Sequence, residues 1–162
     1  MAGWPIETDT LKDANKVIVQ FQNRFKEVRT QAVNCRTMIN DTNEVNTRRM
    51  FDLYSLVNAT RRLADDNINT PGLQAAFDER FPALTGTVDI VSEYTVTVGP
   101  AMVAFETWIS THTAINNGSG RPDVYQYDVN GALEVRVFTL GAAAKQDVLD
   151  EVDALIAVFS IA

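Results

Sequence analysis

Cysteine, histidine and long apolar runs are all scarce in this 162-residue chain, and each shortage excludes a class of protein. The single cysteine, Cys35, cannot form an internal disulfide, which indicates a reducing compartment. A single histidine, His112, excludes most zinc-ligand spacings. Without a run of about 18 apolar residues, no segment is predicted to span a membrane. The N-terminus lacks the basic and apolar regions of a signal peptide, so we expect a soluble intracellular protein.

Basic charge is also in short supply, because 14 lysines and arginines accompany 21 acidic residues and the net charge is −7. This balance disfavours direct nucleic-acid binding, which needs a basic surface. The charge is divided unevenly: residues 1–62 hold ten basic and seven acidic side chains, whereas residues 63–162 hold four and fourteen. Two interpretations remain open. The two parts pair inside one bundle, or a positive face of one subunit meets a negative face of the next.

Apolar residues make up 46% of the chain, and their spacing predicts long helices. The strongest pattern predicts a helix over residues 10–40, because its apolar positions are separated alternately by three and four residues. Val17, Val33 and Met38 widen this stripe, which favours a multi-helix bundle over an isolated coiled coil. The seam consists of Leu11, Ala14, Ile18, Phe21, Phe25, Val28, Ala32, Cys35 and Ile39.

The remaining chain predicts further helices around the first. We expect them over about residues 42–65, 71–80 and 141–159, each with one apolar face. Residues 86–116 also show helical spacing on one face, which predicts a long helix kinked at Pro100. The positions at this spacing are Val88, Val91, Thr95, Val98, Met102, Phe105, Ile109 and His112. The alternative is a strand that ends at Val98, followed by a helix that starts at Pro100.

One β-hairpin is predicted before the last helix, over about residues 123–138. The pair Asn130-Gly131 stands between two β-rich runs, and a two-residue turn favours this pair because both positions need positive φ. The predicted fold is therefore mainly α: an up-down helical bundle with one inserted hairpin. Residues 10–162 form its single domain, and residues 1–9 form an N-terminal arm.

No residue set predicts catalysis, a cofactor or a metal site. Cys35 lies on the apolar seam and is interpreted as a small buried side chain. His112 is interpreted as a helix-end residue that interacts with the dipole. The acidic pairs at residues 65–66, 78–79 and 150–151 are interpreted as solvated. The chain is therefore predicted not to be an enzyme and to need no cofactor.

Exposed aromatic, basic and turn residues are the candidates for contacts between subunits. An arm that carries a tryptophan is expected to dock on the bundle or on a neighbouring subunit. The two arginine doublets suit ion pairs on a helix surface. The candidates are Trp4, Ile6, Arg48, Arg49, Arg61, Arg62, Tyr125, Tyr127, Asn130 and Gly131.

The last third of the chain resembles a known group of proteins. Its order is Phe105-Glu106-Thr107-Trp108-Ile109, a glycine-rich loop, Tyr127-Asp128-Val129-Asn130-Gly131, Val137-Phe138-Thr139 and an amphipathic helix over residues 148–156. Over residues 100–160 this resembles small helical proteins encoded in the structural gene modules of tailed bacteriophages. The resemblance implies a structural or assembly protein of a virion, assembled in the host cytoplasm.

Two functions are therefore expected. In the first, the chain acts as a homo-oligomer and contacts other virion proteins. In the second, it is a soluble cellular helical-bundle adaptor that binds a partner helix or a small ligand.

Overall fold

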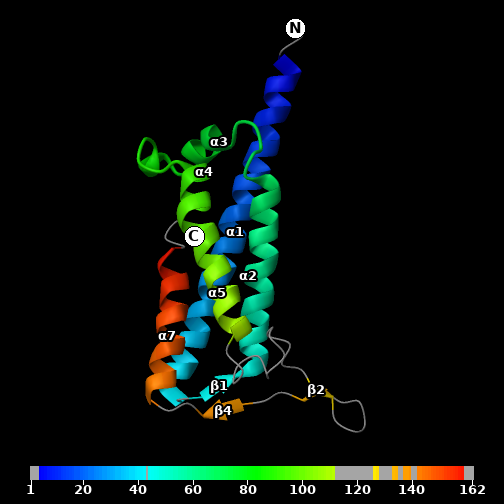
Figure 1. Cartoon of the computed structure of the whole chain (residues 1–162). Coiled ribbons are helices and arrows are strands. Elements are labelled where there is room, and N and C mark those ends of the chain that lie inside the picture. Colours follow the sequence, from blue (N-terminus) through cyan, green and yellow to red (C-terminus); the bar gives the residue numbers. More distant parts are fainter. Residues whose placement is uncertain are drawn as a thin grey trace.

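Four long helices form the body of the protein (Figure 1). The structure is a computed structural model that describes residues 4–42, 44–111, 126–127, 133–134, 137–139 and 142–158. The helices run alternately up and down, and each packs on the next, with the last packing back on the first. α1 and α5 therefore occupy opposite corners of the bundle. The four are α1 (Trp4–Thr42), α2 (Thr47–Asn67), α5 (Gly99–Thr111) and α7 (Ala142–Ala157). The prediction of a mainly helical up-down bundle is confirmed.

Short elements join these helices. Between α2 and α5, the chain forms α3 (Leu73–Arg80), which packs on α1, a 3₁₀ turn η1 (Pro82–Leu84) and α4 (Ile90–Ser92). Near the other end of the bundle, β1 (Glu44–Asn46) pairs antiparallel with β4 (Val137–Thr139). No helix in the described part of the chain is long and apolar enough to cross a membrane.

The predicted seam of α1 is the spine of the core. From Ala14 to Ile39, every seam residue is buried, and the rings of Phe21 and Phe25 stack with centroids 5.6 Å apart. Val17 also lies in the core, as predicted. Val33 does not, since 40% of its surface is exposed. The buried stripe is thus narrower at Val33 than the sequence predicts, and α1 presents an outer face to solvent there.

The bounds of two helices differ from the prediction. α1 begins at Trp4, so the prediction of a separate arm is wrong for residues 4–9. Pro5 is tolerated because the N–H groups of the first helical turn have no acceptor within the helix, so a missing N–H there costs nothing. The second predicted helix begins later, at Thr47, because residues 44–46 pair with β4.

A π-helical segment, η2 (Glu93–Val98), precedes Gly99-Pro100. Residues 90–111 are helical throughout, so the strand alternative is wrong. Pro100 has no N–H, and its ring would clash with the carbonyl four residues earlier in an α-helix. The wider turn relieves this conflict, and the N–H of Gly99 donates to the carbonyl of Tyr94, five residues earlier.

The π turn shifts the buried face of the segment by one residue. Val98, Met102, Phe105 and Ile109 are buried as predicted. Upstream of the turn, however, Ile90 and Tyr94 are buried, and the predicted Val91 is exposed. A glycine suits the position next to the turn, because a Cβ at Gly99 would make a tight contact, 3.0 Å from the carbonyl oxygen of Tyr94.

The hairpin predicted over residues 123–138 is not seen as a whole in the described residues. β2 (Gln126–Tyr127) pairs antiparallel with β3 (Leu133–Glu134), while β4 joins β1 in a separate sheet. A two-residue turn at Asn130-Gly131 would pair Tyr127 with Glu134, but the structure pairs it with Leu133. The turn residues themselves lie outside the described residues.

We expect Phe25→Ala to destabilise the bundle strongly. Phe25 is 1% exposed at the centre of the seam, and truncating a buried phenylalanine costs about 3–5 kcal/mol. That is a large part of the about 5–15 kcal/mol that stabilises an ordinary domain. Thermal and urea unfolding followed by circular dichroism measure the loss, with Val33→Ala as the exposed control on the same helix. Equal melting of the two variants would contradict the packing described for α1.

Candidate functional site

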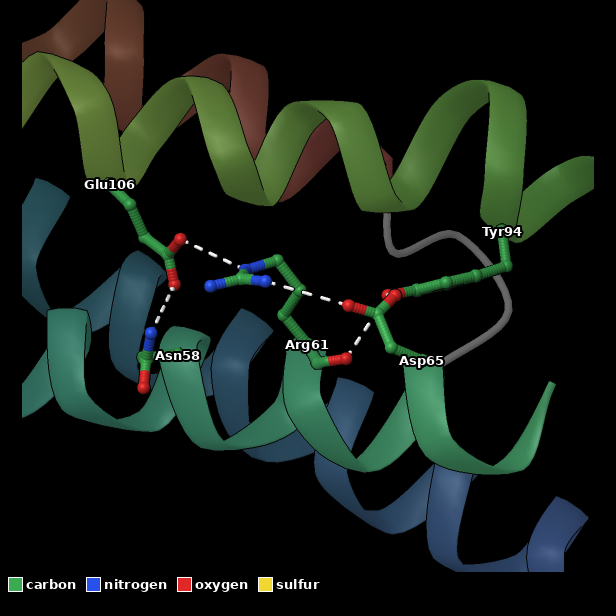
Figure 2. Close-up of polar contacts among 5 residues, drawn as sticks. All are labelled: Asn58, Arg61, Asp65, Tyr94 and Glu106. Atoms are coloured by element: carbon green, nitrogen blue, oxygen red, sulfur yellow. Dashed lines mark hydrogen bonds and ion pairs between the residues drawn. The ribbon is translucent and has the colours of Figure 1, made fainter.

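A cluster of polar side chains links α2 to the η2–α5 segment (Figure 2). We call Asn58, Arg61, Asp65, Tyr94 and Glu106 the Arg61 cluster. The α2 members lie at intervals of three and four residues, which places them on one face of the helix. Figure 2 shows Arg61 between the two carboxylates, with Asp65 on one side and Glu106 on the other.

Glu106 is the buried charge of the cluster. Its residue surface is 8% exposed, in a helix that is otherwise apolar on this side. Arg61 Nε donates to one carboxylate oxygen at 2.9 Å, and Asn58 Nδ2 donates to the other at 3.1 Å. A desolvated carboxylate is stable in a helix interface only when it is paired and hydrogen-bonded, and here both oxygens have partners. The pair therefore ties α2 to α5.

Tyr94 closes the other end of the cluster. Its hydroxyl donates to Asp65 Oδ1 and lies 3.2 Å from the carbonyl oxygen of Arg61. Burial, and then the hydrogen bond to Asp65, raise the pKa of Tyr94 above its ordinary value. Arg61 Nη1 also lies 3.5 Å from Asp65 Oδ2. The hydroxyl is thus held in its neutral form as a hydrogen-bond donor.

An open groove of about 560 Å³ lies over this end of the cluster. Side chains of Arg61, Asp65 and Tyr94 line its polar end, and Thr95 lies beside them. The rest of its wall is formed by Gly99, Pro100, Val103 and Ala104 from the start of α5. A surface of this kind suits an apolar side chain or a helix better than a reaction that needs a closed site.

Cys35 is buried, as the sequence predicts. It is 5% exposed, and its Sγ lies 3.9 Å from the carbonyl oxygen of Arg49. Burial raises the pKa of the Cys35 thiol to about 11, although the nearby Arg49 charge acts in the opposite direction. A thiol with a raised pKa is a poor nucleophile at neutral pH, which supports a packing role. His112 lies outside the described residues.

The acidic pairs do not gather into a metal site in the described part of the chain. Asp65 belongs to the Arg61 cluster, whereas Asp66 is exposed. Asp78 accepts a hydrogen bond from Gln74, and Asp150 accepts one from Gln146. Asp65 is exposed as well, with 52% of its side-chain surface accessible, so the interpretation of these carboxylates as solvated holds for it. It also has partners on α2 and η2.

The basic doublets fall into different environments. Arg61 turns inward, with its side chain 25% exposed, while Arg62 next to it is exposed. Arg49 is exposed on α2, and the side chain of Arg48 is outside the described residues. Arg61 therefore links α2 to α5 within the chain, and its role as a subunit contact stays a prediction.

The other predicted contact residues are described only in part. Trp4 and Ile6 lie in the first turn of α1, and Tyr127 lies in β2, each without a described side chain. The remaining three, at residues 125, 130 and 131, lie outside the described residues.

Some of the uneven charge is paired inside the chain. Arg36 on α1 forms an ion pair with Asp153 on α7, and Arg61 pairs with Glu106. Lys145 on α7 donates to the carbonyl oxygen of Asn40. The interpretation that the basic and acidic parts pair within one bundle therefore holds for the two ion pairs. Pairing within the bundle does not account for the lysines on the outer face of α1.

The sequence analysis missed Asn58, Tyr94 and Glu106. Glu106 had a visible signal, because it is the one charged residue between Glu93 and the end of α5. A lone carboxylate in an apolar helix indicates a buried partner. Its partner could not be identified, because Arg61 lies 45 residues away in the sequence. No protein family model matches this chain, and neither the curated proteins nor the solved structures include a significant match.

Replacing Arg61 should destabilise the protein by leaving Glu106 short of one partner. Hydrogen bonds to charged groups contribute about 1.5–3 kcal/mol, and we expect Arg61→Met to lose about that much. Arg62→Met is the matched control, because surface changes usually stay within about 0.5 kcal/mol. Adding Glu106→Gln to Arg61→Met should recover part of the loss, since no buried charge then remains. Equal unfolding midpoints in urea for Arg61→Met and Arg62→Met would contradict the role of the pair.

Tyr94→Phe should remove a pH dependence of stability. Because the pKa of Tyr94 is higher in the folded chain than in the unfolded chain, its contribution is complete below about pH 10 and is lost as the pH rises further. Below that pH, the variant should lose about 0.5–1.5 kcal/mol with the hydrogen bond to Asp65. Unfolding midpoints of both proteins between pH 7 and 11 measure the difference, which should shrink with rising pH. A constant difference would contradict the assignment.

Proposed function

We propose that the chain is a non-enzymatic structural or assembly protein that acts through contacts between copies of itself. One observation carries this proposal: α1 is much longer than the helices that pack on it. It has 39 residues and spans about 58 Å, whereas α2 has 21 residues and spans about 31 Å. Its N-terminal end therefore extends beyond its neighbours in the bundle (Figure 1).

The projecting end continues the heptad register of the seam. Trp4 and Leu11 are seven residues apart, so they fall on the same line of α1 as the buried Ala14 and Ile18. A helix end with apolar residues in register suits packing against a second copy. The two sequence candidates Trp4 and Ile6 belong to this end.

The virion assignment rests on the resemblance of residues 100–160 to structural proteins of tailed bacteriophages. In such a particle, the chain would contact further copies and other virion proteins. Mass spectrometry of purified phage-like particles from the source would test this part of the proposal, because a virion component is recovered in a fixed ratio to the other structural proteins. Its absence from such particles would contradict the assignment.

A helical-bundle adaptor is the second candidate, and the open groove beside Tyr94 favours it. A groove of about 560 Å³ with an apolar wall can accept residues from an amphipathic partner helix. In this case, the chain would be a monomer until its partner binds. The oligomeric state of the isolated chain therefore separates the two functions.

We expect the purified chain to have a native mass of at least twice 17.9 kDa. Native mass spectrometry and sedimentation velocity over a range of concentrations measure it. Trp4→Asp should lower the mass without lowering the melting temperature, because the change lies at the projecting end of α1. Ala154→Asp, at an exposed position of α7, serves as the control. A mass of one chain at every concentration would contradict self-assembly and favour the adaptor.

A further inference from the structure

The exposed large apolar side chains gather in two places. Among the residues whose burial the structure describes, Val19 and Val33 lie on α1, with 36% and 40% of their surfaces exposed. The others lie on the segment from α4 to α5: Val91 at 38%, Val96 at 73% and Val103 at 46%. Isolated exposed valines are ordinary, but two sets on two helical faces indicate contact surfaces.

The first set belongs to what we call the α1 outer face, the line of exposed residues from Lys12 to Thr37. Along this line, positions recur every three or four residues and all are exposed. Three of them are lysines, at residues 12, 16 and 26, and none is acidic. Two open grooves of about 440 and 470 Å³ lie along this face. Glu27 lines the first beside Lys26, and Val19 lies beside the second with Lys12 and Lys16. The face is therefore basic, hollowed and partly apolar.

The second set belongs to what we call the α5 row, formed by Val96, Pro100 and Val103. Pro100 and Val103 also form part of the wall of the groove beside Tyr94. Residues 81–111 contain three acidic side chains and no basic one, whereas residues 12–37 contain six basic and two acidic ones. Glu106 is held by Arg61, which leaves Asp89 and Glu93, seven and three residues before Val96 on the same segment. The two faces are thus complementary in charge and alike in having exposed valines.

The two faces point in opposite directions. α1 and α5 occupy opposite corners of the bundle, and the buried seam of α1 faces its interior. The α1 outer face therefore lies on one side of the molecule, and the α5 row lies on the other. One chain cannot bring its own two faces together, but two copies can.

We infer that the α1 outer face of one copy packs on the α5 row of a second copy. This inference rests on the proposed self-assembly and adds a second contact to the one proposed at the projecting end of α1. Apolar contact between the valines supplies attraction, and lysines opposite Asp89 and Glu93 fix the orientation. Because the contact joins two different surfaces, a pair of copies still has one unused face at each end. Such head-to-tail contacts produce rings or filaments, not closed two-fold dimers.

Two variants, each changed on one face, test the inference. Both, and the control, are made in a Trp4→Asp parent, so that the projecting end of α1 cannot pair. Val19→Asp with Val33→Asp places carboxylates on the α1 outer face, opposite the acidic side chains of the next copy. Val96→Lys with Val103→Lys places lysines in the α5 row, opposite the basic face. Ala154→Lys, at an exposed position of α7, is the control, because it lies on neither face. Circular dichroism melting verifies that each variant is folded.

Sedimentation velocity and native mass spectrometry give the result. The parent and the Ala154→Lys control should form assemblies larger than two chains, and each double variant alone should stay a single chain. An equimolar mixture of the two double variants should form a pair and grow no further, because each brings one intact face. Added salt should weaken the parent assembly, since the Debye length falls from about 10 Å at 0.1 M to about 3 Å at 1 M.

The outcomes separate this inference from the proposed function. If the folded double variants assemble like the parent, self-assembly stands and the two faces are wrong. If the mixture of folded variants stays as single chains while the parent assembles, the head-to-tail pairing is wrong. If the Trp4→Asp parent is a single chain at every concentration, the two-face inference fails, and the native mass of the unchanged chain still decides the proposed function.

Discussion

Burial of one apolar seam along α1 is the constraint on which the other elements depend. The seam is buried from Ala14 to Ile39, and α2, α3 and α7 all pack against the helix that carries it. α2 and α7 both reach the C-terminal part of α1, where Cys35 contacts the carbonyl oxygen of Arg49 and Arg36 pairs with Asp153. Exposing the seam to water would cost free energy, so the helices pack where they cover it. The loops and short strands follow from that packing of the helices.

The fourth helix joins the bundle through polar as well as apolar contacts. α5 does not pack extensively on α1, so its position depends on α2 and α7. The Arg61–Glu106 pair fixes the α2 side, and the π turn before Pro100 brings Tyr94 over Asp65 at the same interface. Buried polar pairs stabilise less than apolar contacts of equal size, but they tolerate fewer alternative registers. The cluster therefore specifies how α5 sits on α2.

Both proposals follow from surfaces that this packing leaves uncovered. The outer side of α1 and the exposed row of α5 remain outside because each helix buries only one stripe in a four-helix arrangement. The internal pairs Arg36–Asp153 and Arg61–Glu106 account for part of the uneven charge. The lysines of α1 and the acidic side chains near α5 account for more of it, on opposite sides of the molecule.

The sequence by itself determined that the chain is mainly helical and which face of α1 is buried, because both follow from the spacing of neighbouring residues. It also determined the buried face of α5 beyond Val98. Only the tertiary structure decided which residues before Val98 are buried, since the π turn adds one residue to the regular helical spacing. It alone decided that Arg61 turns toward Glu106 while Arg62 stays exposed. That choice depends on a partner 45 residues away, and local periodicity holds no information about such distant contacts.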